Sequence, residues 1–208
     1  LLFTQYKPKV VINCAAFTDV YCAEGSKKVE AFKVNAEGVK NLAILSNKYG
    51  FKLVHFSTDF IFDGARNSPY TENDIPSPLS VYAKSKYEGE TYIKQFCSDF
   101  LIIRTSWLYG RHGKNFIDTI IRAALEKSTL SVVDDQLGTP TWTMDLSKAV
   151  IQLMDREATG VFHYSNEGAT SWYELSREIL RLSEENKIKI KCKKVNPIST
   201  EKHKSPAH

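Results

Sequence analysis

The sequence has few of the features that would define a function class at once. It holds 4 cysteines among 208 residues, and no two of them have the spacing of a metal site or a redox motif. No apolar run approaches the roughly 20 residues that a membrane-spanning helix needs, and no targeting segment is visible. The cysteine spacing favours free thiols in a reducing compartment. We therefore expect a cytoplasmic protein with no membrane partner.

A strong excess of charge is also missing. The formal net charge is +4, and 42% hydrophobic with 25% charged residues is an ordinary balance for a globular protein. Nucleic-acid binding usually shows a clustered basic face, so we expect no nucleic-acid partner. In the densest basic stretch, residues 187–194, lysines alternate with isoleucines and a cysteine. This period of two predicts a strand with one solvated face.

What the sequence does have is an alternation of expected strands and helices. Short apolar runs predict strands, the first of them buried, at 10–12, 53–56, 101–103, 130–133 and 161–163. Helical patterns cover 28–48, ended by Gly50, and 80–96, 116–125, 144–154 and 171–182. The segment 58–79 is rich in turn residues and predicts a long loop. The alternation predicts an α/β fold whose parallel sheet places ligands at the carboxyl ends of its strands.

Tyr82 and Lys86 lie four residues apart on an expected helix, so their side chains share one face. A lysine ammonium beside the phenol is expected to lower the tyrosine pKa. Such a tyrosine can deliver a proton to a forming alkoxide near neutral pH. The spacing alone carries little weight, because exposed pairs of this kind are usually inert.

Ser57, Thr58 and Asp59 follow the expected strand 53–56, at the end where a parallel sheet places ligands. A hydroxyl there can hydrogen-bond a substrate carbonyl beside the tyrosine. The alternative is a turn that the side chains stabilise as the chain leaves the strand. Taken together, hydroxyl, phenol and ammonium on successive elements form the constellation of a carbonyl reductase.

Longer motifs run through nearly the whole chain in a fixed order. They are VINCAAFT at 11–18, VNAEGV at 34–39, STDFIFDG at 57–64, PYTE at 69–72, PLSVY at 78–82 leading into Lys86, RTSWLYG at 104–110, DDQLGTPT at 134–141 and SWYE at 171–174. With these motifs the chain resembles the extended short-chain dehydrogenase/reductase superfamily and, within it, the dTDP-4-dehydrorhamnose reductase family.

The resemblance implies a role for each matching residue. Tyr82 would protonate the sugar oxygen, Lys86 would hold the nicotinamide ribose and tune Tyr82, and Thr58 would bond the carbonyl or the phenol. The cofactor would be lined by Ala15, Ala16, Thr18 and Ser57, together with Tyr82 and Lys86. The substrate would contact Trp107, Gln136 and Thr139. Simple packing remains open for Trp107 and for the two alanines, and a plain turn remains open for the Gly138–Pro140 stretch.

The resemblance also implies an architecture. We expect a Rossmann-like, doubly wound parallel sheet that lacks its first βαβ portion, with a small α/β substrate-binding lobe. Residues 1–106 would form the partial dinucleotide-binding domain, and residues 107–208 would form mainly the substrate lobe, with some segments returning to the first domain. No glycine-rich turn precedes Leu1, so we expect the part of the family that holds the pyrophosphate and selects between NADPH and NADH to lie outside this chain.

The expected activity is reduction of the C4 ketone of dTDP-4-dehydro-L-rhamnose to dTDP-L-rhamnose with NADPH or NADH. The resemblance further suggests a Mg²⁺ ion and a homodimer. Two alternatives stay open. One is another nucleotide-sugar enzyme of the superfamily, such as an epimerase, and the other is a non-catalytic regulatory relative, because a fold alone does not assign a function.

Overall fold

The structure is a computed structural model that describes residues 2–203 of the chain. Among them, the contacts divide the chain into two compact units. The first comprises residues 2–105 and 152–164, and the second comprises residues 106–151 and 165–203. Each unit is described by itself.

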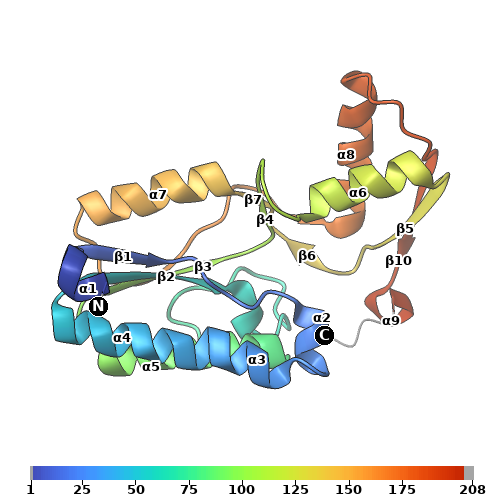
Figure 1. The fold of residues 1–208 in the computed structure, drawn as a ribbon. Helices are drawn as coiled ribbons and strands as arrows, with labels where there is room; N and C mark the ends of the chain where they lie inside the picture. The colour runs from blue at the N-terminus through green and yellow to red at the C-terminus, as the bar shows by residue number, and fades with distance from the viewer. Residues whose placement is uncertain (1, 204–208) are drawn as a thin grey trace. The chain divides into compact units, whose positions relative to one another are not determined.

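The first unit is built on a four-stranded parallel sheet in the order β1-β2-β3-β8 (Figure 1). Its strands are β1 (Val10–Asn13), β2 (Lys52–Thr58), β3 (Phe100–Thr105) and β8 (Gly160–His163). In register, Val11 pairs with Leu53, and Leu53 pairs with Phe100. The expected parallel α/β sheet is therefore confirmed. The carboxyl ends of β1 and β2 carry the segments that the sequence analysis singled out.

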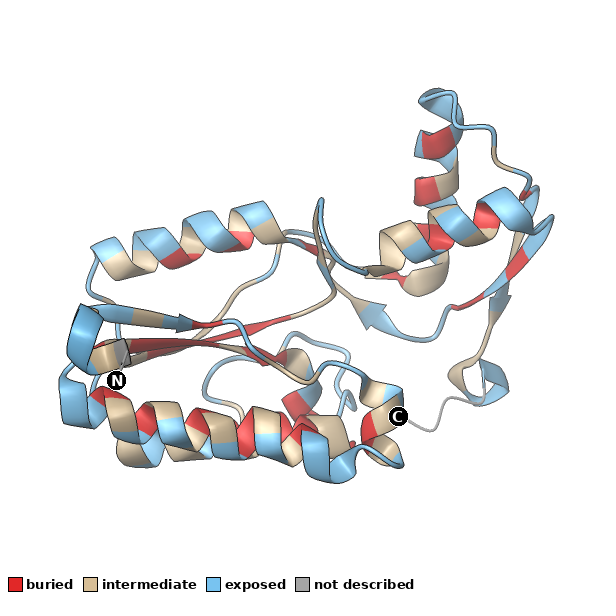
Figure 2. Ribbon diagram, viewed as in Figure 1, coloured by how far each residue is buried: buried red, intermediate tan, exposed pale blue. Residues whose placement is uncertain are grey.

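Helices cover one face of this sheet (Figure 1). The helical segments of the first unit are α1 (Leu2–Tyr6), α2 (Val20–Glu24), α3 (Lys28–Phe32), the π-helical turn η1 (Lys33–Glu37), α4 (Gly38–Tyr49), the 3₁₀ turn η2 (Asp59–Ile61) and α5 (Val81–Phe96). A buried core joins α4 and α5 to the sheet through Val39, Ala43, Leu53, Ile93 and Ile102. The buried residues in Figure 2 accordingly follow the inner faces of these helices and strands.

The predicted helix at 28–48 is correct in extent but is not a single α-helix. It is built from α3, the π turn η1 and α4, and it ends where Gly50 adopts φ +70°. A π turn inserts an extra residue into the helix. Here it turns the side chain of Asn35 inward, where it is fully buried and bonded to distant backbone.

The strand at 10–12 is confirmed, but the expectation that it is buried is wrong. Val10 is 40% exposed and Ile12 is 47% exposed. The reason is that β1 is an edge strand of the described sheet.

The second unit is formed by short strands and two amphipathic helices. Its elements are β4 (Leu108–Tyr109), α6 (Phe116–Glu126), β5 (Thr129–Val133), β6 (Leu137–Gly138), β7 (Thr141–Trp142), β9 (Thr170–Ser171), α8 (Trp172–Glu185), β10 (Lys194–Ile198) and α9 (Thr200–His203). Helix α7 (Thr143–Asp155) has residues in both units. A second core, with Ile120, Leu130 and Ile179, joins α6 and α8 to the parallel pair β5 and β10.

The predicted strand over 187–194 is wrong, because regular pairing begins only at Lys194. The backbone N–H groups of Lys191 and Cys192 both donate to the carbonyl of Ala124, near the end of α6. The segment therefore runs over a helix terminus and satisfies free carbonyls there. Cys192 is buried, and the lysines that alternate with apolar residues point outward without forming a strand.

Candidate active site

Thr58 and Tyr82 come together where β2 ends and α5 begins. Thr58 is the last residue of β2, and Tyr82 lies in the first turn of α5. The Thr58 hydroxyl donates to Asp59 Oδ1 at 3.1 Å, and it interacts with the Tyr82 phenol strongly enough to lower the pKa of that phenol. Hydroxyl and phenol therefore meet at the carboxyl end of a parallel strand.

The pKa of Tyr82 does not move in the expected direction. Burial raises it to about 12, the Asp59 carboxylate adds to the rise, and Thr58 offsets only part of it. Burial also raises the pKa of Asp59, to about 6. Lys86 is not among the groups that shift the pKa of Tyr82 here, so its tuning of the phenol stays a prediction. A phenol of this kind is fully protonated at neutral pH and has a proton to donate.

Lys86 lies on α5, one helical turn after Tyr82, and its side chain reaches the backbone of β2. Its Nζ donates to the carbonyl of Phe56 at 2.6 Å and lies 3.5 Å from His55 Nε2. The side chain is 3% exposed. Burial lowers the pKa of Lys86 to about 8, against the opposing effect of Glu90. The ammonium is therefore directed at the backbone of β2.

A buried His–Asn pair continues from Lys86 to strand β1. His55 Nδ1 lies 3.1 Å from Asn13 Nδ2, and Asn13 Oδ1 accepts the backbone N–H of Ala15 at 3.1 Å. Burial holds the pKa of His55 well below its ordinary value, and the Lys86 charge adds to this effect. The ring is consequently neutral. Neither residue was singled out in the sequence analysis.

The start of α5 is fixed by groups from other elements. Ser80 caps the helix by accepting the N–H of Ala83, and Glu24 Oε1 accepts the N–H of Val81 at 2.6 Å. Ser85 donates to the carbonyl of Tyr82 at 2.7 Å. These bonds hold the turn that carries Tyr82 in one backbone position.

Asn35 connects the α5 start to the segment that follows β1. Its amide donates to Ser85 Oγ and to the Phe17 carbonyl, each at 3.0 Å, and its Oδ1 accepts the Phe17 N–H at 2.8 Å. Helix α5 lies very close to the backbone of η1. A Cβ added at Gly89 would lie 2.2 Å from the Asn35 carbonyl oxygen. The expected cofactor segment and the expected proton donor thus share one scaffold.

The residues expected to line a cofactor divide into two kinds. Ala15 and Thr18 are exposed, and Ala16 is partly exposed, all just beyond β1. Ser57 is buried, and its hydroxyl has no hydrogen-bond partner among the described residues. Contact between these residues and the nicotinamide end of a dinucleotide stays a prediction.

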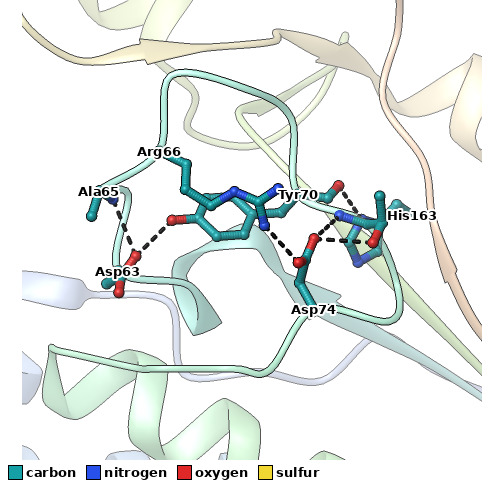
Figure 3. Close-up of polar contacts among 7 residues, drawn as sticks. Asp63, Ala65, Arg66, Tyr70, Asp74 and His163 are labelled. Atoms are coloured by element: carbon teal, nitrogen blue, oxygen red, sulfur yellow. Dashed lines mark hydrogen bonds and ion pairs between the residues drawn. The ribbon is translucent and has the colours of Figure 1, made fainter.

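The long loop after η2 is held down by its own side chains (Figure 3). Tyr70 donates its hydroxyl to Asp63 at 2.6 Å, and Arg66 pairs with Asp74 at 2.5 Å. His163 of β8 contacts the Tyr70 carbonyl through Nδ1 at 3.2 Å. The segment 58–79 is therefore a loop with a short 3₁₀ turn, as predicted apart from that turn, and it is anchored to an outer strand of the sheet.

In the second unit, the three residues expected at the substrate are tied to Trp172 or to nearby backbone. The Trp107 ring stacks on Trp172 with centroids 3.3 Å apart, and Trp172 Nε1 donates to Gln136 at 3.2 Å. The Thr139 hydroxyl donates to the carbonyl of Gly168 at 2.7 Å. Trp107 itself has φ +45°, a left-handed conformation that is strained for a bulky residue. Trp172 had been noted only as part of a family motif, and no signal in the sequence gave it this bridging position.

Three further findings concern metal ligands, membrane-spanning helices and cysteines in the part of the chain that the structure describes. No group of three or more His, Cys, Asp or Glu side chains that could hold a metal ion occurs there, so the suggested Mg²⁺ finds no ligand set among them. No helix in residues 2–203 is long and apolar enough to cross a membrane. All four cysteines are free thiols, as expected.

Comparison with known proteins first defines the class. The fold is that of Rossmann-like, extended short-chain dehydrogenase/reductase structures. A solved dTDP-4-dehydrorhamnose reductase from Bacillus anthracis, in complex with NADP, superimposes on this chain with a TM-score of 0.93 at 38% identity. The match covers 100% of this chain and 71% of the Bacillus chain.

The chain belongs to the family described as the RmlD substrate binding domain, whose model matches residues 1–208. A dTDP-4-keto-6-deoxy-D-glucose reductase from Streptomyces niveus is 41% identical over 86% of this chain and 62% of its own length. A dTDP-4-dehydrorhamnose reductase from Aggregatibacter actinomycetemcomitans is 36% identical over 96% of this chain and 69% of its own. The resemblance expected from the motifs is therefore confirmed. The chain spans less than two thirds of the length of the Streptomyces relative.

Proposed function

We propose that the protein containing this chain is an NAD(P)H-dependent reductase of a dTDP-linked 4-keto sugar, and that dTDP-4-dehydro-L-rhamnose is its substrate. The observation that carries the proposal is the interaction of the Tyr82 phenol with the Thr58 hydroxyl at the end of β2, one helical turn before the buried Lys86. The relatives that are named as reductases of such sugars support it.

The proposed chemistry assigns each residue of the chain one task. The dinucleotide supplies a hydride to the C4 carbon when it is bound. The phenol of Tyr82, protonated because burial raises its pKa, delivers a proton to the C4 oxygen as that oxygen gains negative charge. Thr58 then donates a hydrogen bond to the phenolate. A charged Lys86 stabilises the phenolate through their shared helix face.

The remaining assignments are part of the same proposal. Ala15, Ala16, Thr18 and Ser57 would contact the nicotinamide end of the cofactor, and Trp107, Gln136 and Thr139 would contact the nucleotide sugar. The first unit would serve the cofactor and the second the sugar. A homodimer and a cytoplasmic location stay predictions.

The test is Tyr82→Phe in the full-length protein. Loss of the phenolic proton should reduce turnover about 10²–10⁴-fold, the usual contribution of a positioned general acid, while the dinucleotide still binds. Tyr87→Phe, on the same helix, is the matched control and should leave turnover unchanged. Turnover is followed by loss of nicotinamide absorbance with dTDP-4-dehydro-L-rhamnose and, separately, with dTDP-4-keto-6-deoxy-D-glucose.

Three results would count against the proposal. Near-normal reduction by Tyr82→Phe would remove the proton-donor role. Epimerised sugar without net consumption of NAD(P)H would favour the epimerase alternative. No turnover of either sugar by the unaltered protein, with nucleotide sugar still bound, would favour a non-catalytic relative.

A further inference from the structure

The buried pair Asn13 and His55 has no task in the proposed reaction, yet it contacts Lys86 directly. His55 is fully enclosed at 1% exposure, in the middle of β2 between β1 and β3. A neutral imidazole carries its proton on one ring nitrogen and leaves the other as an acceptor. The hydrogen-bond partners at the two nitrogens therefore determine which nitrogen carries the proton. Both partners are known here.

The direction of the hydrogen bonds is fixed at the β1 end by a backbone group. The Ala15 N–H can only donate, so the Asn13 oxygen faces it at 3.1 Å. The Asn13 NH₂ group consequently faces His55 Nδ1, also at 3.1 Å, and can only donate to it. Nδ1 is therefore the bare nitrogen, and the single proton of the ring is on Nε2.

That proton is aimed at Lys86. His55 Nε2 lies 3.5 Å from Lys86 Nζ, at the long limit of a hydrogen bond, and Nζ meanwhile donates to the Phe56 carbonyl at 2.6 Å. An ammonium has no lone pair and would meet the Nε2–H with like polarity. A free amine has one lone pair and can accept the Nε2–H while it donates to Phe56.

We propose that His55, oriented by Asn13, is a positioning residue that favours the free-amine form of Lys86 in the absence of ligands. The role rests on the proposed function in one respect, because Lys86 must carry a charge to stabilise a Tyr82 phenolate. Through this pair, three successive polar contacts connect the backbone N–H of Ala15, in the expected cofactor segment, to the Lys86 amino group.

The other charged groups near the pair act in the opposite sense or are already neutralised. Glu90, one turn further along α5, favours the Lys86 ammonium. Its carboxylate is shared with Arg104 of β3 at 2.8 Å and with the exposed Lys94 at 3.8 Å. From β2 and β1 the groups are His55 and the uncharged Asn13. Burial lowers the pKa of Lys86 against the effect of Glu90, and the His55 N–H would act in the same sense as burial.

The test is nuclear magnetic resonance on the full-length protein without ligands. The ¹⁵N shifts of the His55 ring should show a neutral Nε2–H tautomer from pH 5 to 9. The ¹³C signal of Lys86 Cε, assigned by its loss in Lys86→Met, should titrate near pH 8, where burial places the lysine pKa. An Nδ1–H tautomer, or a protonated ring in this range, would overturn the proposal even if every variant failed to fold.

The variant that separates positioning from packing is His55→Gln. A glutamine can offer a carbonyl oxygen in place of the Nε2–H, which stabilises the ammonium and should raise the Lys86 midpoint by about one pH unit. The exposed Lys84 on the same helix is the control and should not shift. An unchanged Lys86 midpoint would overturn the role. Because no cofactor or sugar is present, this outcome is independent of whether Tyr82→Phe supports the reductase proposal.

Discussion

At the residue scale, Asp59 is the carboxylate that most affects the expected proton donor. It accepts from Thr58, is partly buried, and raises the pKa of Tyr82. Its own pKa rises to about 6 through burial. A carboxyl with this shift holds its proton more tightly in the folded protein than in the unfolded chain. Its contribution to stability is therefore complete below its unfolded pKa, near 4, and is lost as pH rises through about 6.

This sign gives a prediction for Asp59→Asn. The variant carries no charge to bury, so its free energy of unfolding relative to the unaltered protein should improve between pH 4 and pH 7. We expect a gain of about 1–2 kcal/mol after allowing for the partial exposure of the side chain. Urea unfolding at a series of pH values measures it.

Asp63→Asn, in the same loop, is the matched control. The hydrogen bond from the Tyr70 hydroxyl and the N–H of Ala65 lower the pKa of Asp63. That carboxyl is ionised in the folded and the unfolded chain above about pH 5, so the effect of Asp63→Asn on the free energy of unfolding should hardly change from there to pH 7. If Asp59→Asn shows no pH-dependent gain, the carboxylate is better solvated than its surroundings indicate.

At the element scale, the close approach of α5 to the π turn determines where Tyr82 and Lys86 lie. Gly89 permits it, because a Cβ there would lie 2.2 Å from the backbone oxygen of Asn35, an atom that cannot rotate away. Gly89→Ala should therefore separate the two segments and destabilise the protein by about 1–3 kcal/mol, the usual cost of overpacking. Denaturant unfolding measures the loss.

Gly38→Ala is the control for helix propensity. Gly38 is also helical, and its nearest contact, the Lys33 oxygen, would lie 3.3 Å from an added Cβ. Alanine is favoured over glycine in a helix by about 1 kcal/mol, so this variant should be neutral or stabilising. Equal stability of the two variants would show that the Asn35–Gly89 contact is not tight.

The elements that could be predicted from the sequence are those with local signals. The helix from Ser80 to Phe96 has its own N-cap serine, and the end at Gly50 needs a left-handed residue. Both were expected. The stretch 187–193 shows that a local signal can mislead, because its alternating lysines satisfy the period of a strand while its backbone bonds to the end of a helix.

What could not be predicted depends on partners far apart in the chain. Asn13 and His55 are 42 positions apart, and Asn35 and Ser85 are 50 apart. Nothing near either residue in the sequence shows that it will be buried beside the other. The family motifs supplied Thr58, Tyr82 and Lys86, but the hydrogen bonds that orient them come from residues whose role appears only in the fold.

At the scale of the whole molecule, the candidate residues separate by unit. The residues proposed for the proton transfer and the cofactor lie in the first unit, and Trp107, Gln136 and Thr139 lie in the second. The boundary between Thr105 and Ser106 falls inside the motif at 104–110, so adjacent residues of one motif serve different units. The proposed function then requires that cofactor affinity and sugar affinity respond to variants in different units.

That requirement is tested with two variants of the full-length protein. Lys86→Met removes a charged hydrogen-bonding group from the first unit and should weaken dinucleotide binding about tenfold, the usual effect of losing such a bond. Nucleotide-sugar binding should be retained.

Trp107→Ala removes an aromatic surface from the second unit and should weaken nucleotide-sugar binding tenfold or more, as is usual for a buried aromatic contact. Dinucleotide binding should be retained. Calorimetry with each ligand measures both effects. Trp142→Ala is the control for loss of an indole, because Trp142 is 39% exposed and lies in the same unit.

The competing explanation is that Trp107 only packs on Trp172, at a centroid distance of 3.3 Å, and against Gly138. In that case Trp107→Ala would lower the melting temperature and leave the affinity for the nucleotide sugar unchanged, and the second unit would lose its proposed aromatic contact with the substrate.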